Sequence, residues 1–308
     1  LCPLSKIDVI GVHGQTLLHH PHPMRFLGQH LAYTVQVADL SRLAQRTGVT
    51  VVGNFRAADI AAGGEGAPLV PYAHRILFGR KNATFAVHNL GGIGNVTLLR
   101  NNKVDLAFDT GPANIWIDTV VRWKTNGKLS FDRDGSLARK GTVHGNLLMR
   151  LLAHPYFHRK PPKSAGWEDF GGAYLKKFRP MVSKLRLEDA AATVTYATAI
   201  ATADAYKRFI FPRAKPTKMI LAGGGAKNVF LRELLVRFLP SLRVETSDKF
   251  GFAPEHLEAV CFALMAVETL RGRPSNELRA TGASRSVICG EIAWGGGQID
   301  RLRNVLLR

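Results

Sequence analysis

Short runs of apolar residues alternate along the chain with segments in which apolar residues recur every three or four positions. The runs predict buried strands at residues 7–12, 49–52, 84–87, 96–99, 104–108 and 218–222. The periodic segments predict helices at residues 40–46, 113–123, 145–153, 187–211, 228–238 and 255–270. This alternation predicts an α/β fold with a mostly parallel sheet, and a mainly helical half after about residue 200.

A glycine-rich turn interrupts the alternation. Two apolar segments, residues 84–90 and 96–99, flank Gly91 and Gly92, which is the pattern of a β-hairpin. Residues 100–103 then lead into the strand expected at 104–108. We therefore expect some antiparallel pairing within the parallel sheet.

Composition narrows the class of protein. The length of 308 residues is typical of about two domains, and 42 Lys and Arg against 23 Asp and Glu give a net charge of +19. This charge favours polyanionic partners, but the basic residues are scattered without interleaved aromatic residues, which favours solvated faces over a nucleic-acid groove. No apolar run is long enough to span a bilayer.

The cysteine and histidine patterns favour neither disulfides nor a metal centre. Cys2, Cys261 and Cys289 are widely spaced, so we expect free thiols in a reducing compartment, the cytoplasm. The histidines at positions 19, 20 and 22 are separated by proline, which disrupts the register of a metal-binding helix. We expect them on a surface loop and assign no metal ligand.

Two glycine-rich segments could approach a phosphate group. Gly223, Gly224 and Gly225 connect a predicted strand to a helix that begins near Asn228, where backbone N–H groups are available to an anion. Such a loop is equally compatible with close packing. The turn at Gly91 and Gly92 is a second place of this kind, and the two together could hold a triphosphate from two sides.

Two carboxylates are candidates for chemistry. Asp109 ends a predicted strand ahead of a helix, where ligands of open α/β sheets bind, although an aspartate there could also cap the helix. Glu258 lies beside apolar residues in the first turn of another predicted helix, which implies half-burial unless it faces a polar site. For Glu258 a site and a solvated helix edge are both open.

Polar residues also follow two other predicted strands. His13 and Gln15 follow the strand at 7–12, and Arg56 follows the strand at 49–52. These side chains could bind the hydroxyl or carboxylate groups of a sugar. 

Taken together, the motifs resemble the anhydro-N-acetylmuramic acid kinase family. The matching stretches, which run in the family's order over nearly the whole chain, include His-Gly-Gln-Thr at 13–16, Asn-Leu-Gly-Gly-Ile at 89–93, Phe-Asp-Thr-Gly-Pro at 108–112, Pro-Lys-Ser at 162–164, Gly-Gly-Gly at 223–225 and Thr-Gly-Ala-Ser at 281–284. The resemblance implies a two-lobed actin-like ATPase (ribonuclease H-like) fold, with residues 1–80 in the N-terminal lobe and 81–308 in the C-terminal lobe.

The resemblance also implies an activity. The family uses ATP and Mg²⁺ to cleave the anhydro bond of a cell-wall sugar with water and to phosphorylate the oxygen that is released. By resemblance, Asp109 is the base that activates water, and Glu258 lies near water and sugar. Substrate binding is expected from His13, Gln15, Arg56, Thr110 and Asn114, and nucleotide binding from Gly91, Gly92, Gly223, Gly224, Gly225 and Asn228.

The start of the chain differs from the family. The family opens with Gly-Thr-Ser-x-Asp-Gly, its first phosphate loop, and this motif is not present here, so the first strands of the N-terminal lobe are expected to lie upstream of Leu1. The alternative is a non-catalytic sugar- or nucleotide-binding remnant, and a nucleic-acid-binding module ranks third. The expected partners are ATP and an amino sugar, with a homodimer possible and neither nucleic acid nor membrane expected.

Overall fold

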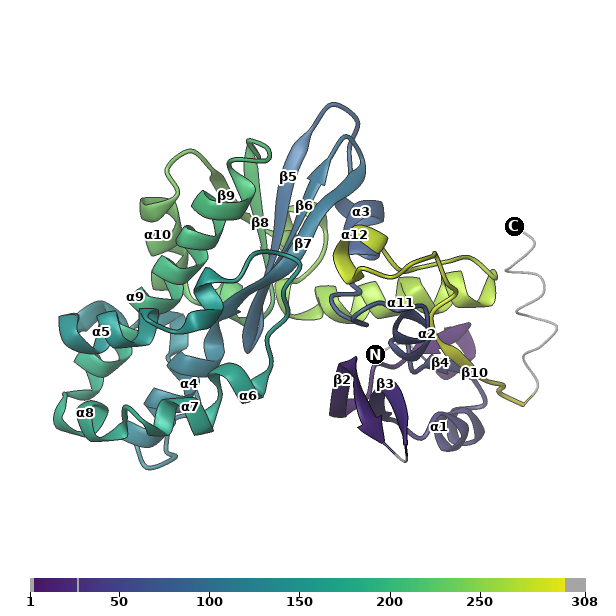
Figure 1. The fold of residues 1–308 in the computed structure, drawn as a ribbon, viewed down its shortest axis with the longest axis horizontal. Helices are drawn as coiled ribbons and strands as arrows, with labels where there is room; N and C mark the ends of the chain where they lie inside the picture. The colour runs from purple at the N-terminus through teal and green to yellow at the C-terminus, as the bar shows by residue number, and fades with distance from the viewer. Residues whose placement is uncertain (1–2, 27, 297–308) are drawn as a thin grey trace. The chain divides into compact units, whose positions relative to one another are not determined.

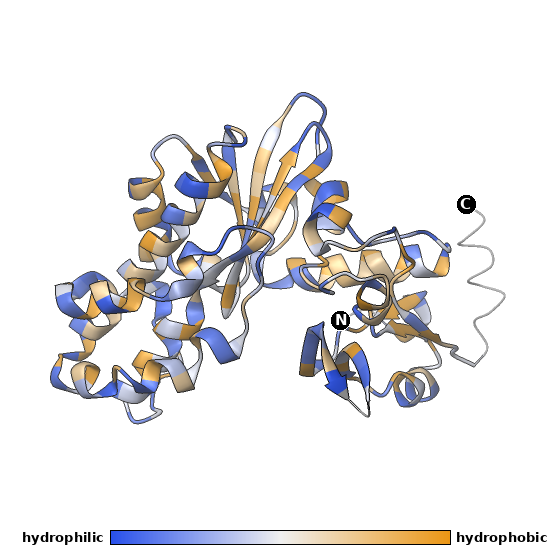
Figure 2. Ribbon diagram, viewed as in Figure 1, coloured by the Kyte–Doolittle hydropathy of each residue, from blue (hydrophilic) through white to orange (hydrophobic). Residues whose placement is uncertain are grey.

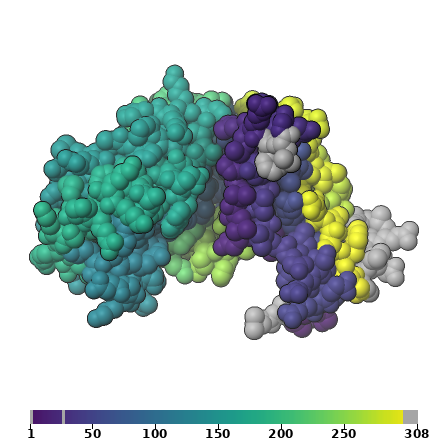
Figure 3. All heavy atoms as spheres, turned by 60° about the horizontal axis from the view of Figure 1, so that its bottom comes forward, coloured from purple at the N-terminus to yellow at the C-terminus, as the bar shows by residue number. Residues whose placement is uncertain are grey.

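A computed structural model describes residues 3–26 and 28–296, in which the chain forms two compact units. Unit 1 combines the chain up to Leu77 with the chain from Glu258 onward, and unit 2 is continuous from Phe78 to Leu257. Figure 3 shows the purple N-terminal and yellow C-terminal residues of unit 1 side by side. Residues from 258 onward therefore pack with residues before 78, and the division into lobes near residue 80 stays a prediction. Cys2 lies outside the described residues.

Unit 1 contains a three-stranded sheet built from both ends of the chain. Its order is β1 (Val9–Gly11), β4 (Thr50–Gly53) and β10 (Glu291–Ala293). β4 is central and buried throughout, parallel to β1 and antiparallel to β10. The helices of this unit are α1 (Leu40–Thr47), α2 (Ala57–Ala61), α3 (Pro71–Phe78), α11 (Leu257–Leu270) and α12 (Leu278–Thr281).

The helix α11 packs closely on β1. A Cβ at Gly11 would lie 2.6 Å from the carbonyl oxygen of Phe262, so glycine allows the helix backbone to approach the strand. The helix is coloured mostly hydrophobic in Figure 2, and Leu257, Cys261 and Met265 are buried. The helix expected from residue 255 begins two residues later, after a 3₁₀ turn at Pro254–His256.

A long hairpin in unit 1 corrects one expectation. β2 (Gln15–Phe26) pairs antiparallel with β3 (Gln29–Val37), and the three histidines expected on a loop lie on β2. Proline is usually excluded from the interior of a sheet, but the prolines of β2 lie where the register shifts between His20 and Met24. In this two-stranded ribbon both strands are also edge strands, which tolerate proline. The exposed leucines on this hairpin explain why the segment lacks the pattern of a buried strand.

Unit 2 is built on a five-stranded sheet with the order β7–β6–β5–β8–β9. Its strands are β5 (Thr84–Leu90), β6 (Ile93–Arg100), β7 (Lys103–Pro112), β8 (Lys218–Ala222) and β9 (Arg243–Thr246). The predicted hairpin is confirmed, because β5 pairs antiparallel with β6 and β6 with β7, while β5, β8 and β9 are parallel. The sheet is therefore mixed, and the mostly parallel sheet was wrong. β9 and β10 are strands that the sequence pattern missed, because both are short.

Unit 2 also contains helices, of which some contact the sheet and others lie away from it (Figure 1). They are α4 (Asn114–Lys124), α5 (Gly145–Leu152), α6 (Trp167–Phe170), α7 (Gly172–Lys176), α8 (Arg179–Lys184), α9 (Leu187–Ala205) and α10 (Val229–Phe238). Helix α9 contacts α4, α5 and α10 and is therefore buried on most sides. Its buried residues are mostly alanine and threonine, and the Thr195 hydroxyl is satisfied within the helix by donating to the Ala191 carbonyl. The expected helix at 187–211 ends at Ala205 and continues as a π turn, η5 (Tyr206–Ile210).

The chain has an α/β fold in two compact units, as the sequence predicts. In the part of the chain that the structure describes, no helix combines the length and the apolar character needed to cross a bilayer.

Candidate active site

Asp109 lies on β7, close to the end of the strand, where the pairing with β6 shifts register between Gly94 and Asn95. Its side chain is partly exposed, and its Oδ2 accepts a hydrogen bond from the backbone N–H of Ala165 at 2.8 Å. Helix α4 is preceded by Ala113 at its N-cap, with no side-chain cap. Asp109 therefore does not cap this helix, and the alternative prediction that it is a helix cap was wrong.

A second segment of the chain holds Asp109 from outside the sheet. The Asp109 N–H donates to the carbonyl of Lys163 at 3.1 Å, and the hydroxyl of Tyr156 donates to the Asp109 carbonyl at 2.6 Å. Tyr156 belongs to η4 (Pro155–His158) and is fully buried. The sequence alone assigns no role to Tyr156 or Lys163, because both are about fifty positions from Asp109 along the chain.

Asn95 is a further residue at this place that the sequence analysis missed. It pairs with Asp109 across β6 and β7, so the two side chains emerge on the same face of the sheet. The Oδ1 of Asn95 is buried and has no hydrogen-bond partner among the described residues. A buried polar atom of this kind is rare and is expected to meet a partner in the working protein. Its position beside the glycine turn was the only signal in the sequence.

Thr110 faces the interior. Its hydroxyl donates to the Gly94 carbonyl at 3.1 Å and lies 3.3 Å from Nε2 of His88, whose Nδ1 is 3.2 Å from the Tyr206 hydroxyl. Burial lowers the pKa of His88 to about 3, so the ring is neutral. A proton on Nε2 satisfies the whole chain of hydrogen bonds from Tyr206 to Gly94. Thr110 thus fixes the glycine hairpin rather than presenting its hydroxyl to solvent.

The two glycine elements meet at one end of the sheet of unit 2. The carbonyls of Gly91 and Gly92 accept hydrogen bonds from the first backbone amides of α4, including Asn114 N–H at 3.0 Å. The Asn114 side chain donates to the Leu90 carbonyl at 3.0 Å, and a Cβ at Gly225 would lie 2.7 Å from Asn114 Oδ1. The hairpin, the loop and Asn114 are therefore neighbours.

The structural requirement for glycine differs among these positions. Gly223 has φ +78° and a Cβ there would lie 2.4 Å from Asn89 Oδ1, so conformation and packing both require it. At Gly92 no φ in the left-handed region occurs and a Cβ would meet nothing within 4 Å, and at Gly224 the nearest atom would be 3.9 Å away. Neither backbone conformation nor internal packing explains Gly92 and Gly224.

Asn228 caps a helix. Its Oδ1 accepts the N–H of Leu231 at 2.9 Å at the start of α10, and the residue is buried. A Cβ at Gly135 would lie 2.3 Å from the same oxygen. The capping role accounts for the asparagine, and its part in nucleotide binding stays a prediction.

In unit 1 the structure brings Arg56 and His13 together. The Arg56 Nε donates to His13 Nε2 at 3.0 Å, and its Nη1 donates to the Gly66 carbonyl at 2.6 Å. Burial, and secondarily the charge of Arg56, lower the pKa of His13 to about 4, so the ring is neutral near pH 7. Gln15 is exposed at the start of β2.

The loop that Arg56 contacts is anchored by Asp59. This fully buried carboxylate accepts the Gly66 N–H, the Asn276 amide and the Thr281 hydroxyl, each at 2.8 Å. Asp59 therefore joins the N-terminal and C-terminal parts of unit 1 beside the Arg56 loop.

Glu258 lies in unit 1, at the start of α11. The residue is exposed on the first turn of α11, whose buried face carries Leu257 and Cys261 instead. Of the two environments left open by the sequence, this exposure is that of a solvated helix edge, and the role of Glu258 near water and sugar stays a prediction. Glu258 and Asp109 belong to different units.

Metal-ligating residues do not cluster in residues 3–26 and 28–296, where no group of three or more His, Cys, Asp or Glu is placed to hold an ion. The thiols of Cys261 and Cys289 are buried, and burial raises their pKa values to about 12 and about 11.

Comparison with known proteins assigns the family. The family model described as anhydro-N-acetylmuramic acid kinase matches residues 1–295. A curated protein of that name from Caldanaerobacter subterraneus subsp. tengcongensis is 43% identical over 294 residues, which are 94% of this chain and 74% of that protein. Its namesake from Gloeobacter violaceus is 44% identical over 291 residues, 94% of this chain and 75% of that protein.

The comparison with solved structures gives weaker likeness. The activator of 2-hydroxyisocaproyl-CoA dehydratase from Clostridium difficile, with bound ADPNP, is 14% identical with a TM-score of 0.40, over 64% of this chain and 65% of that chain. A likeness at this level is too weak to support a functional comparison.

The chain is a kinase by these criteria. It belongs to the anhydro-N-acetylmuramic acid kinase family, because the family model spans nearly its whole length and curated relatives share about two fifths of its residues. The family expected from the sequence motifs is confirmed.

Proposed function

We propose that this chain uses ATP and Mg²⁺ to cleave the anhydro bond of 1,6-anhydro-N-acetylmuramic acid with water and to phosphorylate the released oxygen, giving N-acetylmuramic acid 6-phosphate. Membership of the kinase family supports an actin-like ATPase class, the use of ATP and an amino-sugar substrate. A reaction that consumes ATP is consistent with the cytoplasm as its location.

The proposal that this chain binds ATP rests on two glycines, Gly92 and Gly224. Packing does not demand glycine at either place, and a Cβ at Gly92 would project into open space. Absent side chains leave room for phosphate oxygens to approach the backbone of both turns. Mg²⁺ is commonly held through the phosphates of the nucleotide with few protein ligands, so these turns suit a metal-bound triphosphate, whose charge the ion neutralises.

Asp109 is assigned the role of general base. It is partly exposed, and the Ala165 N–H fixes one carboxylate oxygen. In the proposed step, a water loses its proton to Asp109 and its oxygen bonds to the anomeric carbon as the anhydro C–O bond breaks. The oxygen that leaves takes the γ-phosphoryl group, and ADP is released.

The other candidate residues keep supporting roles in this proposal. Asn95 and Asn114 are placed near Asp109 and the glycine elements, while Thr110 fixes the hairpin from within. His13, Arg56 and Gln15 are proposed to bind the sugar, and Glu258 to lie near the water and sugar. The ring of His13 is neutral, so the positive charge in this pair is that of Arg56, which is proposed to attract the carboxylate of the sugar's lactyl group.

Isotopic labelling tests the reaction. The chain is incubated with ATP, Mg²⁺ and the anhydro sugar in ¹⁸O-labelled water, and the product is analysed by mass spectrometry. We expect a phosphosugar with one heavy oxygen on the anomeric carbon and none in the phosphate. Unlabelled phosphosugar would refute the hydrolytic step. Binding of ATP or sugar without any product would favour the non-catalytic alternative.

A further inference from the structure

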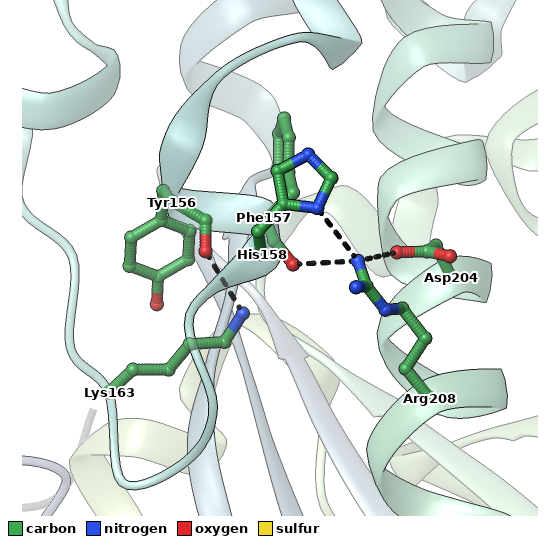
Figure 4. Close-up of polar contacts among 6 residues, drawn as sticks. All are labelled: Tyr156, Phe157, His158, Lys163, Asp204 and Arg208. Carbon is green, nitrogen blue, oxygen red and sulfur yellow. Dashed lines mark hydrogen bonds and ion pairs between the residues drawn. The ribbon is translucent and has the colours of Figure 1, made fainter.

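Lys163 occupies an environment that an ammonium group rarely occupies. Only 7% of the residue is exposed, and its Nζ lies 4.5 Å from the ring centroid of Tyr156, 4.9 Å from that of Phe209 and 5.7 Å from that of Phe108. Its hydrogen bond is to the Tyr156 carbonyl, at 3.4 Å (Figure 4). The faces of the rings attract the cation and offset part of the loss of water.

A stability role does not explain this lysine. Burying an ammonium group is costly, and apolar side chains of similar volume often replace buried charges with little loss or with a gain. A methionine would fill the same aromatic enclosure. We therefore look for a role in what the lysine holds in place.

The lysine and its neighbours hold Asp109. Phe108 directly precedes Asp109, the Tyr156 hydroxyl bonds to the Asp109 carbonyl, and the Lys163 carbonyl accepts the Asp109 N–H. Two residues further on, the Ala165 N–H donates to the carboxylate. One cation thus joins the three pieces of chain around the carboxylate, namely β7, η4 and the segment 163–165.

A second cation fixes the same turn from the helical side. Arg208 donates to the Phe157 carbonyl at 3.2 Å and lies 3.3 Å from both His158 Nδ1 and Asp204 Oδ2 (Figure 4). Arg208 and Lys163 therefore bond to the carbonyls of consecutive residues of η4. The turn that carries Tyr156 is held on both sides.

We propose that Lys163 is a positioning residue that orients Asp109 for the reaction, acting through Tyr156 and the Ala165 N–H. The inference rests on the proposed role of Asp109 as base. A shift of about 1 Å in a reacting group can cost about 100-fold in rate, so loss of the anchor should lower kcat more than it raises KM.

The titration of Lys163 supplies a signature. Burial is the main cause that lowers its pKa to about 8, Arg208 and Arg159 lower it further, and Asp204 and Asp109 oppose the shift. The charged form is therefore lost as the pH rises through about 8. If the cation anchors the segment, kcat of the wild type should fall above this pH.

Three variants test the proposal. Lys163→Met keeps the volume without the charge, Lys163→Arg keeps a charge at all accessible pH values, and Lys160→Met is the matched control, an exposed lysine of the same segment. We expect Lys163→Met to lower kcat about 10- to 100-fold with KM changed by less than about threefold, and to lack the decline above pH 8. Lys163→Arg should recover part of the rate at pH 9, and the control should match the wild type.

Hydrogen exchange separates this inference from the proposed function. In Lys163→Met, the Ala165 N–H should exchange faster while the thermal unfolding temperature stays near the wild-type value. Normal kcat and normal exchange in Lys163→Met would overturn the positioning role. A different result would refute the proposed base instead. If Asp109→Asn is fully active while the Ala165 N–H still exchanges faster in Lys163→Met, Asp109 is not the base and Lys163 has a structural role only.

Discussion

Asp59 in unit 1 and Asp109 in unit 2 are both held by a backbone amide of a loop, yet their surroundings differ. Asp59 is fully buried and accepts hydrogen bonds from three groups of the protein, two of them from the C-terminal part of unit 1. Asp109 is partly exposed, and Asn95 on the strand beside it has a buried Oδ1 with no hydrogen-bond partner in the part of the chain that the structure describes. Asp59 thus belongs to a hydrogen-bond network within the fold, whereas the partly exposed Asp109 suits the catalytic role proposed for it.

The largest expected effect is on catalysis at Asp109. Asp109→Asn keeps the size and the bond from Ala165 but cannot take a proton from water, so kcat should fall about 10²- to 10⁴-fold. Steady-state kinetics with ATP and the anhydro sugar measures the change, and thermal unfolding should remain close to the wild type. A large loss of stability in this variant would make Asp109 resemble Asp59 and remove the contrast.

The same change at Asp59 should act on the fold. In Asp59→Asn one oxygen becomes an NH₂ group that faces donors, so a buried hydrogen bond is replaced by a repulsive contact. We expect the free energy of unfolding to fall by about 3 kcal/mol, in the range for an unsatisfied buried polar group. Urea unfolding gives the value, and hydrogen exchange should locate the loosening at residues 57–66 and 276–284. Unchanged stability would show that Asp59 does not join the two parts of unit 1.

The smallest expected effect concerns one glycine in each unit. A Cβ at Gly64 would lie 2.3 Å from Asp59 Oδ2, so Gly64→Ala should destabilise unit 1. Gly92→Ala has open space and should leave stability within about 0.5 kcal/mol of the wild type. We expect Gly92→Ala to weaken ATP binding about three- to tenfold, because the methyl group stands where phosphate approaches. Calorimetric titration with Mg²⁺ and ATP that shows equal affinity would argue against a phosphate site at this turn.

The sequence predicted the elements with strong patterns. β8 was placed with its correct bounds, and the hairpin of β5 and β6 was predicted from its glycines. The hairpin of β2 and β3 was missed, because exposed leucines and two prolines hide the period of a strand. The mixed sheet was missed because pairing direction depends on which strands meet, and local patterns do not encode this.

Part of the site was also predictable. Asp109 and the glycine elements follow from their places at strand ends, since the ends of neighbouring strands converge. Tyr156, Lys163 and Asn95 could not be found in this way. Their significance depends on contacts between distant segments, such as the Tyr156 hydroxyl and the Asp109 carbonyl, which arise only when η4 folds back on β7.

Unit 1 is built from two separate segments of the chain, and this affects the order in which the protein folds during synthesis. Unit 2 is continuous, so it can fold as soon as residue 257 has left the ribosome. β4 can then pair with β1, but β10, α11 and the Asn276 and Thr281 partners of Asp59 are translated later. The early segments of unit 1 therefore cannot complete their fold until the last part of the chain has been translated. Until then, the surfaces of β1 and β4 that the later elements contact remain uncovered. A nascent chain stalled when residue 257 has just left the ribosome should be cut by protease before residue 77 and protected between residues 78 and 257.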